Sequence, residues 1–227
     1  MASVVFLPGC NFRCPYCHNH PLVLRPQEHG TWPLAEVLDR MDRLQGWVDG
    51  VCVTGGEPTG HRGLPLLLGT FKGRGWAVKL DTNGSDPGAL RSLLRAELVD
   101  AVAVDVKAPL EPIPYRRNAG ASADPEAVRQ TLELLAATPL PLEARTTVHP
   151  ALLSRQELCR LAGQVGRILG RRGGAAARWT AQRCHTADPL DPALRERGAQ
   201  DPETFEQWAA EAQAAFREGL AAGSGTG

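Results

Sequence analysis

Short apolar runs alternate with stretches of helical periodicity along most of this chain, and this alternation limits the folds that it can adopt. Apolar runs suited to buried strands occupy residues 3–7, 51–54, 76–80, 101–106, 142–148 and 176–182. Apolar residues at helical spacing occupy residues 34–44, 64–71, 90–98, 126–137 and 155–169. About six strand–helix units in this order predict a parallel sheet, because parallel strands need a long crossover between them.

The length of the chain favours an incomplete barrel. A full eight-fold barrel typically takes about 250 residues, and 227 are present here. We therefore expect an α/β fold of the shortened, open (β/α)6 partial TIM barrel type, with a C-terminal helix. That amphipathic helix, at 202–220, packs on the sheet or, alternatively, docks a partner. We expect a barrel domain at 1–190 and a helical extension at 191–227 with a frayed Gly/Ser tail from residue 223.

Composition excludes several classes of protein. The chain is 43% hydrophobic, which is too much for a disordered protein, and its 25 basic and 25 acidic side chains argue against a general nucleic-acid binder. It contains no apolar run long enough to span a membrane, and the start MASVVFLPGC lacks the regions of a signal peptide. We expect a cytoplasmic protein that binds neither membrane nor nucleic acid.

Three of the six cysteines form a cluster. Cys10, Cys14 and Cys17 fall within the eight residues CNFRCPYC, a spacing that chance rarely produces. Zinc usually takes four ligands, and His18 is the candidate for the fourth, but no second ligand pair follows and adjacent side chains converge poorly on one ion. An iron–sulfur cube held by three cysteines keeps one iron open to a substrate. The spacing favours the cluster and leaves zinc as the alternative.

The remaining cysteines and two histidines carry no clear chemistry. Cys52 and Cys159 lie in apolar patterns and are expected to be buried thiols, and a structural role is favoured for Cys184. For His149 and His185 we expect surface or capping roles.

Distinctive motifs lie at or near the ends of the expected strands. They are Gly55-Gly56-Glu57-Pro58, Asp81-Thr82-Asn83-Gly84, the pair Asp105 and Lys107, and Arg145. Because the carboxyl ends of parallel strands meet at one edge of the sheet, we expect one shared site there. Each motif also has a plain alternative: a turn for the first two, and a structural ion pair for the others.

These residues resemble a known family. The cysteine spacing with an aromatic residue at Tyr16, followed by GGEP after the next strand, resembles the radical S-adenosylmethionine (SAM) superfamily. The segment VVFLPGCNFRCPYCHNHPLV is similar to the activating proteins of glycyl radical enzymes, in particular those of anaerobic ribonucleoside-triphosphate reductase. The resemblance covers roughly residues 4–195.

The resemblance implies a set of binding residues. The three clustered cysteines would hold one [4Fe–4S] cluster, whose fourth iron binds the amino and carboxylate groups of S-adenosylmethionine. The residues expected to contact that cofactor are Tyr16, His18, Gly55, Gly56, Glu57, Asp81, Asn83, Asp105, Lys107 and Arg145. No side chain is expected to act as an acid or base, because the reactive group belongs to the cofactor.

The resemblance also implies an activity. We expect an enzyme that reductively cleaves S-adenosylmethionine to methionine and a 5′-deoxyadenosyl radical and installs a glycyl radical on a partner, anaerobic ribonucleotide reductase. A reduced flavodoxin or ferredoxin is the expected electron donor. The alternatives are another glycyl radical enzyme of the pyruvate formate-lyase type as target, a small-molecule substrate, and a non-catalytic zinc-binding module.

Two departures from the family pattern bear on these expectations. Only nine residues precede Cys10, fewer than the likened proteins usually carry, and no second cysteine cluster is present. The single cluster favours the reductase type of activator.

Overall fold

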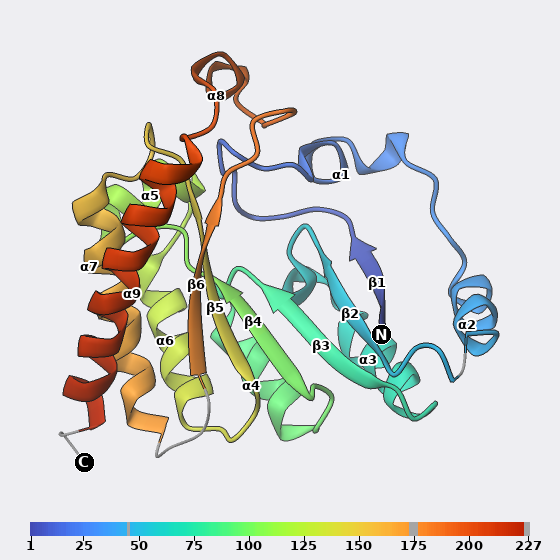
Figure 1. Cartoon of the computed structure of the whole chain (residues 1–227). Coiled ribbons are helices and arrows are strands. Elements are labelled where there is room, and N and C mark those ends of the chain that lie inside the picture. Colours follow the sequence, from blue (N-terminus) through green and yellow to red (C-terminus); the bar gives the residue numbers. More distant parts are fainter. Residues whose placement is uncertain (45, 173–176, 225–227) are drawn as a thin grey trace.

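The computed structural model describes residues 1–44, 46–172 and 177–224, and its centre is one parallel sheet of six strands (Figure 1). The strands are β1 (Ala2–Leu7), β2 (Gly50–Gly55), β3 (Ala77–Thr82), β4 (Ala101–Asp105), β5 (Leu142–Val148) and β6 (Ala177–Arg183). They lie side by side in chain order, and each pairs in parallel with the next. The predicted parallel sheet is confirmed. Ala176, the expected start of the last strand, lies outside the described residues.

Helices connect the strands, and two further helices follow the last strand. They are α1 (His20–Leu24), α2 (Leu34–Asp42), α3 (Leu64–Lys72), α4 (Pro87–Arg95), α5 (Pro112–Ala119), α6 (Pro125–Ala136), α7 (Arg155–Leu169), α8 (Pro192–Arg197) and α9 (Pro202–Ser224), with short 3-10 turns at η1 (Pro26–Glu28), η2 (Pro58–Gly60) and η3 (Gly170–Arg172). The sequence analysis missed α1, α5 and α8, which are only 5, 8 and 6 residues long. Such short helices are below the length at which apolar periodicity identifies a helix.

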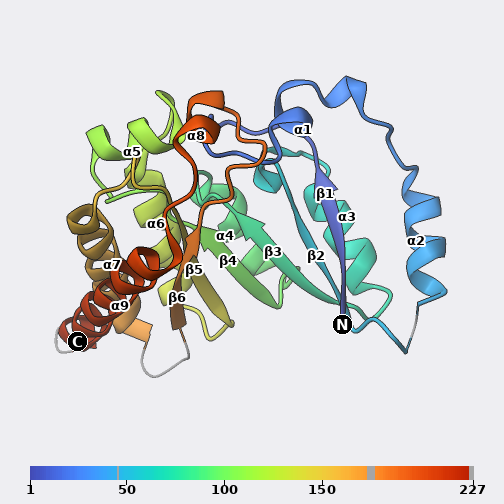
Figure 2. The same ribbon diagram turned by 45° about the horizontal axis from the view of Figure 1, so that its top comes forward.

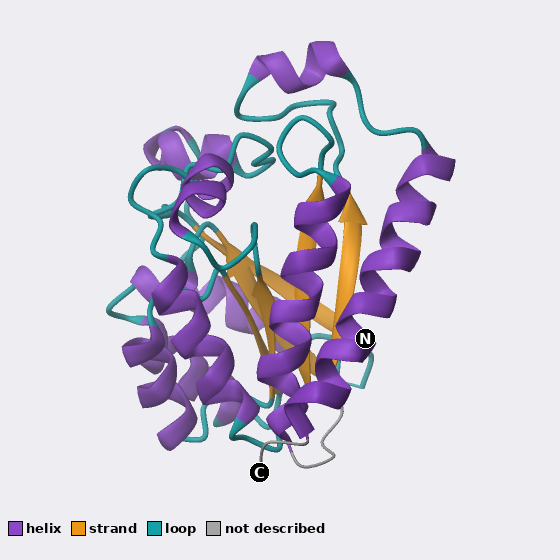
Figure 3. Cartoon of the chain, turned by 90° about the vertical axis from the view of Figure 1, so that its left-hand side faces the viewer, coloured by secondary structure: helices purple, strands orange, loops and turns teal. Residues whose placement is uncertain are grey.

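The two faces of the sheet differ in polarity. On the outer face Val53, Leu80 and Val102 are paired in register and almost fully buried under the helices, which Figure 3 shows stacked in front of the strands. On the inner face the half-buried positions include Asp81 and Arg145. Side chains alternate between faces along a strand, so each strand supplies apolar residues outward and polar residues inward.

The sheet is open. β1 and β6 lie at opposite ends of the strand order, and within the described residues they do not pair with each other. All strands point the same way, and Figure 2 shows α1, α8 and the loop after β1 gathered over their carboxyl ends. The expected open partial barrel is confirmed, and this end of it carries the site.

The C-terminal helix α9 packs along α7 and beside β6. Glycines bring the two helices close together: a Cβ at Gly166 would lie 2.3 Å from the Phe216 carbonyl oxygen, and one at Gly223 would lie 2.3 Å from the Arg167 carbonyl oxygen. Because α9 extends to Ser224 and buries Gly223, the tail does not begin at 223 as expected. Residues 225–227 lie outside the described residues, and the domain division at 190 stays a prediction.

None of the helices in the described part of the chain is long and apolar enough to cross a membrane.

The glycine contacts between α7 and α9 give a test of stability. In the middle of a helix Gly→Ala normally stabilises by about 0.5–1 kcal/mol. Gly163→Ala should follow this rule because the nearest atom to its Cβ is 3.6 Å away, whereas Gly166→Ala should destabilise by about 1–3 kcal/mol because its Cβ meets backbone. Urea unfolding of both variants measures the difference. Equal effects would show that α7 and α9 are not packed as described.

Candidate active site

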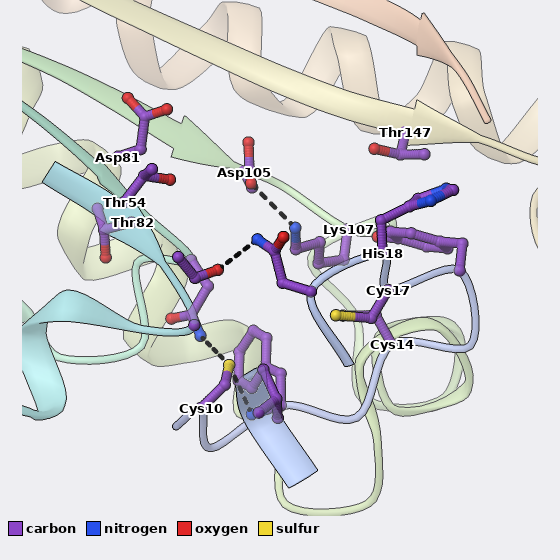
Figure 4. Close-up of a pocket in the computed structure, with 17 residues that line it drawn as sticks. Cys10, Cys14, Cys17, His18, Thr54, Asp81, Thr82, Asp105, Lys107 and Thr147 are labelled. Atoms are coloured by element: carbon purple, nitrogen blue, oxygen red, sulfur yellow. Dashed lines mark hydrogen bonds and ion pairs between the residues drawn. The ribbon is translucent and has the colours of Figure 1, made fainter. Parts of the chain in front are cut away.

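The three clustered cysteines lie on the loop that leaves the carboxyl end of β1. They share a cavity of about 240 Å³ with residues from the ends of β2, β3, β4 and β5. Figure 4 shows the cysteine loop on one side of this cavity, and Asp81, Asp105 and Thr147 on the strands opposite. All the predicted site residues line it except Glu57 and Arg145. The strand-end motifs therefore meet in one place, as expected from the parallel topology.

Backbone hydrogen bonds hold the cysteine loop at several points. Arg13 N–H donates to the Ala119 carbonyl oxygen at the end of α5 (2.8 Å), and Asp191 N–H, just before α8, donates to the Pro15 carbonyl oxygen (2.8 Å). The Arg13 guanidinium also donates to the Cys10 carbonyl oxygen (2.7 Å). The loop is thus fixed by segments from the middle and the end of the chain.

The glycines of GGEP bring the end of β2 against the cysteine loop. Gly55 has φ +119°, and a Cβ there would lie 2.4 Å from the Leu7 carbonyl oxygen. A Cβ at Gly56 would lie 1.7 Å from the Gly9 carbonyl oxygen, and Gly56 N–H donates to the Leu7 carbonyl oxygen (2.8 Å). Only glycine fits at these positions. The Gly55 carbonyl oxygen accepts from Asn19 Nδ2 (2.7 Å), so this peptide group already has a hydrogen bond within the protein.

Glu57 turns away from the cavity and joins two strands. Its Oε1 accepts from Thr59 N–H (3.1 Å) and Thr82 Oγ1 (2.7 Å), and its Oε2 accepts from Asn83 N–H (2.7 Å). Burial raises the pKa of Glu57, although these donors act in the opposite direction. The carboxylate has its partners inside the protein, so its position does not fit the expected cofactor contact. It aligns the end of β3 with GGEP.

Asn83 connects the third strand to the cysteines. Its Nδ2 donates to Asn11 Oδ1 (2.9 Å) and lies 3.7 Å from Cys10 Sγ, and its Oδ1 accepts from Ser85 N–H (2.9 Å). Phe12 N–H also donates to Cys10 Sγ (3.3 Å). Two N–H donors therefore converge on one sulfur, an arrangement that stabilises thiolate ligands and tunes an iron–sulfur centre.

Charged side chains of β3, β4 and β5 form a line of ion pairs beside the cavity. Lys107 Nζ lies 3.2 Å from Asp105 Oδ2, Arg145 Nε lies 2.8 Å from Asp105 Oδ1, and Arg145 Nη1 lies 2.9 Å from Asp81 Oδ2. Asp81 also pairs with Lys79. The ion pairs that the sequence analysis gave as the alternative for these residues are present in the structure, and Arg145 does not line the cavity.

Charge pairing sets the ionisation of the pair that lines the cavity. Burial acts to raise the pKa of Asp105, but Lys107 and Arg145 outweigh it and hold that pKa below its ordinary value. Burial acts to lower the pKa of Lys107, but the Asp105 carboxylate outweighs it and raises that pKa. Both groups therefore stay charged at neutral pH, which leaves a fixed cation facing the cavity.

Tyr16 and His18 lie on the cysteine loop beside this cation. The ring of Tyr16 is buried, with its centroid 5.8 Å from Lys107 Nζ. Among the described residues the Tyr16 hydroxyl has no hydrogen-bond partner. His18 is more exposed, and its Nε2 lies 2.7 Å from the His185 carbonyl oxygen.

Several cavity residues were missed by the sequence analysis. They are Phe12, Asn19, Val23, Thr54, Thr82 and Thr147. Thr54 and Thr147 were available from the sequence, since both lie near the carboxyl ends of predicted strands on the inward-facing alternation. Thr82 lies in a motif that the sequence analysis singled out, at the end of β3. Phe12, Asn19 and Val23 depend on the path of the chain after β1.

The unassigned histidines and cysteines now have places. Cys184 is buried, as favoured, with its Sγ 3.1 Å from the His185 carbonyl oxygen. Cys52 and Cys159 are only half-buried, so the expectation of buried thiols was wrong for both. Cys52 lies on the more polar inner face, which a short apolar run does not reveal.

His149 anchors the end of β5 to the loop after α8. Its Nδ1 accepts from Ala151 N–H (3.1 Å), so Nε2 carries the proton and donates to the Gly198 carbonyl oxygen (3.0 Å). The side chain is buried, and burial lowers its pKa. Of the surface or capping roles expected for His149, the surface role is wrong because the side chain is buried, and the ring instead bonds the turn at Ala151. Through Gly198 it also holds the segment whose Asp191 N–H donates to the cysteine loop.

The cavity fits an iron–sulfur cluster and a polar cofactor. Burial raises the pKa of the Cys14 thiol to about 11, so at neutral pH the thiol keeps its proton unless a bound metal stabilises the thiolate. Tyr16 and Lys107 both line the cavity. The buried Tyr16 hydroxyl has no hydrogen-bond partner among the described residues, and the Lys107 ammonium offers bonds to a ligand. Across the described residues no three His, Cys, Asp or Glu side chains are gathered around a single-ion position.

Comparison with known proteins identifies the family. Residues 4–156, more than half of the chain, match the model of the radical SAM superfamily. A candidate glycyl-radical enzyme activating enzyme of Methanocaldococcus jannaschii is 30% identical over 162 residues, covering 69% of this chain and 65% of that protein. A 7-carboxy-7-deazaguanine synthase of Methanopyrus kandleri is 34% identical over 126 residues, covering 47% of this chain and 49% of that protein.

A solved structure shares the fold. Coproporphyrinogen III oxidase of Escherichia coli, a radical SAM enzyme, superposes with a TM-score of 0.63 at 15% identity, covering 96% of this chain and 52% of that one. This chain thus spans about half to two thirds of the length of these three proteins.

The chain belongs to the radical SAM superfamily. Its cofactors are a [4Fe–4S] cluster and S-adenosylmethionine, as predicted, and the zinc interpretation is set aside. The individual contacts of the site residues with these cofactors stay predictions.

The hydrogen bonds of Glu57 predict a large loss of stability on substitution. Glu57→Gln places an NH₂ group against buried donors, so we expect a loss of about 2–4 kcal/mol in the free energy of unfolding. The control Glu133→Gln, on an exposed position of α6, should change stability by less than about 0.5 kcal/mol. Urea unfolding of the metal-free chain measures both. A Glu57→Gln variant as stable as the control contradicts the described hydrogen bonds.

His149 predicts a pH dependence of stability. Because its pKa in the folded chain is lowered, its contribution is present above the ordinary histidine pKa of about 6.5 and is lost as pH falls through the folded value. Between pH 7.5 and 5.5 the unaltered chain should therefore lose more stability than His149→Gln, which cannot titrate. Thermal unfolding at several pH values measures this difference, and parallel curves for the two proteins would refute it.

Proposed function

We propose that this chain is a radical SAM activating enzyme that installs a glycyl radical on a partner enzyme, with anaerobic ribonucleoside-triphosphate reductase as the expected partner. The observation that carries the proposal is the cysteine cavity at the mouth of an open sheet, whose edge strands β1 and β6 do not pair within the described residues. A backbone glycine of a large protein needs such an approach. The similarity to a candidate glycyl-radical enzyme activating enzyme over 69% of the chain supports the same activity.

The proposed roles follow from the chemistry of the side chains. Cys10, Cys14 and Cys17 hold the cluster, and the Lys107 ammonium receives the carboxylate of S-adenosylmethionine. When bound, the cluster and S-adenosylmethionine supply one-electron cleavage to methionine and a 5′-deoxyadenosyl radical. The protein positions the cofactors and shields them from water, and no side chain needs to act as acid or base.

Further cofactor contacts are proposed for residues that surround this cation. Asp105 and Asp81 offer carboxylates to the ribose hydroxyls or the ammonium group, and Asn83 offers its amide. Tyr16 and His18 flank the adenine. A reduced flavodoxin or ferredoxin is the proposed electron donor, and the barrel domain 1–190 is proposed to carry the chemistry.

A second candidate is a small-molecule reaction of the 7-carboxy-7-deazaguanine synthase type. The 34% identity to such a synthase over 126 residues favours it. Detection of 7-carboxy-7-deazaguanine in an anaerobic cell extract supplied with the reconstituted chain would support this candidate over the first.

Cofactor cleavage tests the proposal directly. The chain reconstituted anaerobically with iron and sulfide, then given dithionite and S-adenosylmethionine, should release 5′-deoxyadenosine. Cys14→Ala should abolish this product, whereas the matched control Cys184→Ala, a buried cysteine outside the cavity, should retain it. Added anaerobic ribonucleotide reductase should then show the paramagnetic resonance signal of a glycyl radical. An intact cluster that yields no 5′-deoxyadenosine contradicts the proposal, and cleavage without the glycyl signal contradicts the choice of partner.

A further inference from the structure

Arg145 bridges the carboxylates of Asp81 and Asp105. Both of these residues line the cavity, but Arg145 does not. Its Nε contacts Asp105 Oδ1 at 2.8 Å and its Nη1 contacts Asp81 Oδ2 at 2.9 Å. The Arg145 side chain is 16% exposed, so this is a mostly desolvated bridge. A guanidinium is planar and its N–H groups have fixed directions. Two carboxylates that share it are therefore fixed relative to each other.

The bridge spans three strands. Arg145 on β5 is the register partner of Asp105 on β4, but Asp81 lies one strand further, on β3, opposite Ala103. Neighbouring strands are about 4.8 Å apart, so the bridge formed by the Arg145 and Asp81 side chains spans about 10 Å across the sheet. It passes the inward-facing Ala103, which is completely buried. A larger side chain at 103 would occupy that path.

Each carboxylate has a second cation on its other oxygen. Asp105 Oδ2 contacts Lys107 Nζ at 3.2 Å, and Asp81 Oδ1 pairs with Lys79 Nζ. The charges therefore alternate in a row: Lys79, Asp81, Arg145, Asp105, Lys107. Without the central cation, both carboxylates would be free to rotate toward their lysines. The Lys107 ammonium would then lose its fixed position in the cavity.

We propose that Arg145 is a positioning residue that orients Asp81 and Asp105 for cofactor binding and does not contact S-adenosylmethionine itself. Through Asp105 it also sets the position of Lys107. The inference rests on the cofactor contacts proposed above for those three residues. It differs from the contact role that the sequence predicts for Arg145.

Cofactor affinity of three variants tests the inference. The dissociation constant of S-adenosylmethionine is measured on the reconstituted chain, together with iron content and the paramagnetic resonance spectrum of the reduced cluster before and after S-adenosylmethionine is added. Arg145→Met should weaken binding about 10–100-fold, the usual effect of losing a residue that supports a ligand. Ala103→Leu should weaken it several-fold although residue 103 does not line the cavity. Ala101→Leu, the same change two residues earlier on the same face of β4, is the control and should leave the affinity unchanged.

In all three variants the iron content and the spectrum before addition should match those of the unaltered chain. In Arg145→Met and Ala103→Leu the spectral change on addition should require a higher cofactor concentration, whereas in the control Ala101→Leu it should not. A purely structural role of Arg145 would instead reduce cluster content. Ala103→Val provides a smaller obstruction if Ala103→Leu does not fold.

A double-variant cycle separates positioning from contact. If Arg145 acts through Asp105, then Arg145→Met combined with Asp105→Asn should bind no more than about 2-fold more weakly than the weaker single variant. Additive losses, or unchanged affinity in the Ala103 variants, would overturn the inference and restore a direct contact. If the unaltered chain itself does not bind S-adenosylmethionine, the proposed site roles fail. If it binds and the variants behave like it, only the role of Arg145 fails.

Discussion

The site depends on a backbone contact between the cysteine loop and the turn after β2. Gly56 N–H donates to the Leu7 carbonyl oxygen and Glu57 N–H donates to the Gly9 carbonyl oxygen, both at 2.8 Å. No side chain fits between these segments, because a Cβ at Gly56 would overlap the Gly9 carbonyl group. The loop therefore cannot shift relative to β2 unless the ends of the two strands separate. This contact gives the three cysteines a fixed place at the mouth of the sheet.

Two further connections extend this fixed unit across the sheet. The Glu57 carboxylate binds the end of β3, which in turn places Asn83 against Cys10. Arg145 links β3, β4 and β5 through its two carboxylate partners. Hydrogen bonds therefore set the cysteine side of the cavity, and ion pairs set the opposite side. A cofactor that bridges the two sides meets groups that are already oriented.

The alternation of strands and helices and the cysteine spacing were sufficient to predict the fold, the family and the place of the site. Alternation specifies a parallel sheet, and a parallel sheet brings strand ends together, so the motifs were expected to meet. The motifs did not reveal which way a side chain points. Glu57 and Arg145 lie in the right motifs and on the right strands, yet their partners come from strands far apart in the sequence. The hydrogen bonds of Asp191 to the cysteine loop and of His149 to the loop after α8 could not be predicted either, because α8 is too short to leave a periodic pattern in the sequence.

The central claim is that the fixed loop holds a four-iron cluster with one iron left to S-adenosylmethionine. Mössbauer spectroscopy of the chain reconstituted with ⁵⁷Fe, before and after S-adenosylmethionine is added, tests it most directly. The account predicts four irons per chain, of which one changes its spectrum on addition while three do not. A spectrum that does not change when S-adenosylmethionine is added, or a chain that retains zinc in place of iron, would contradict it.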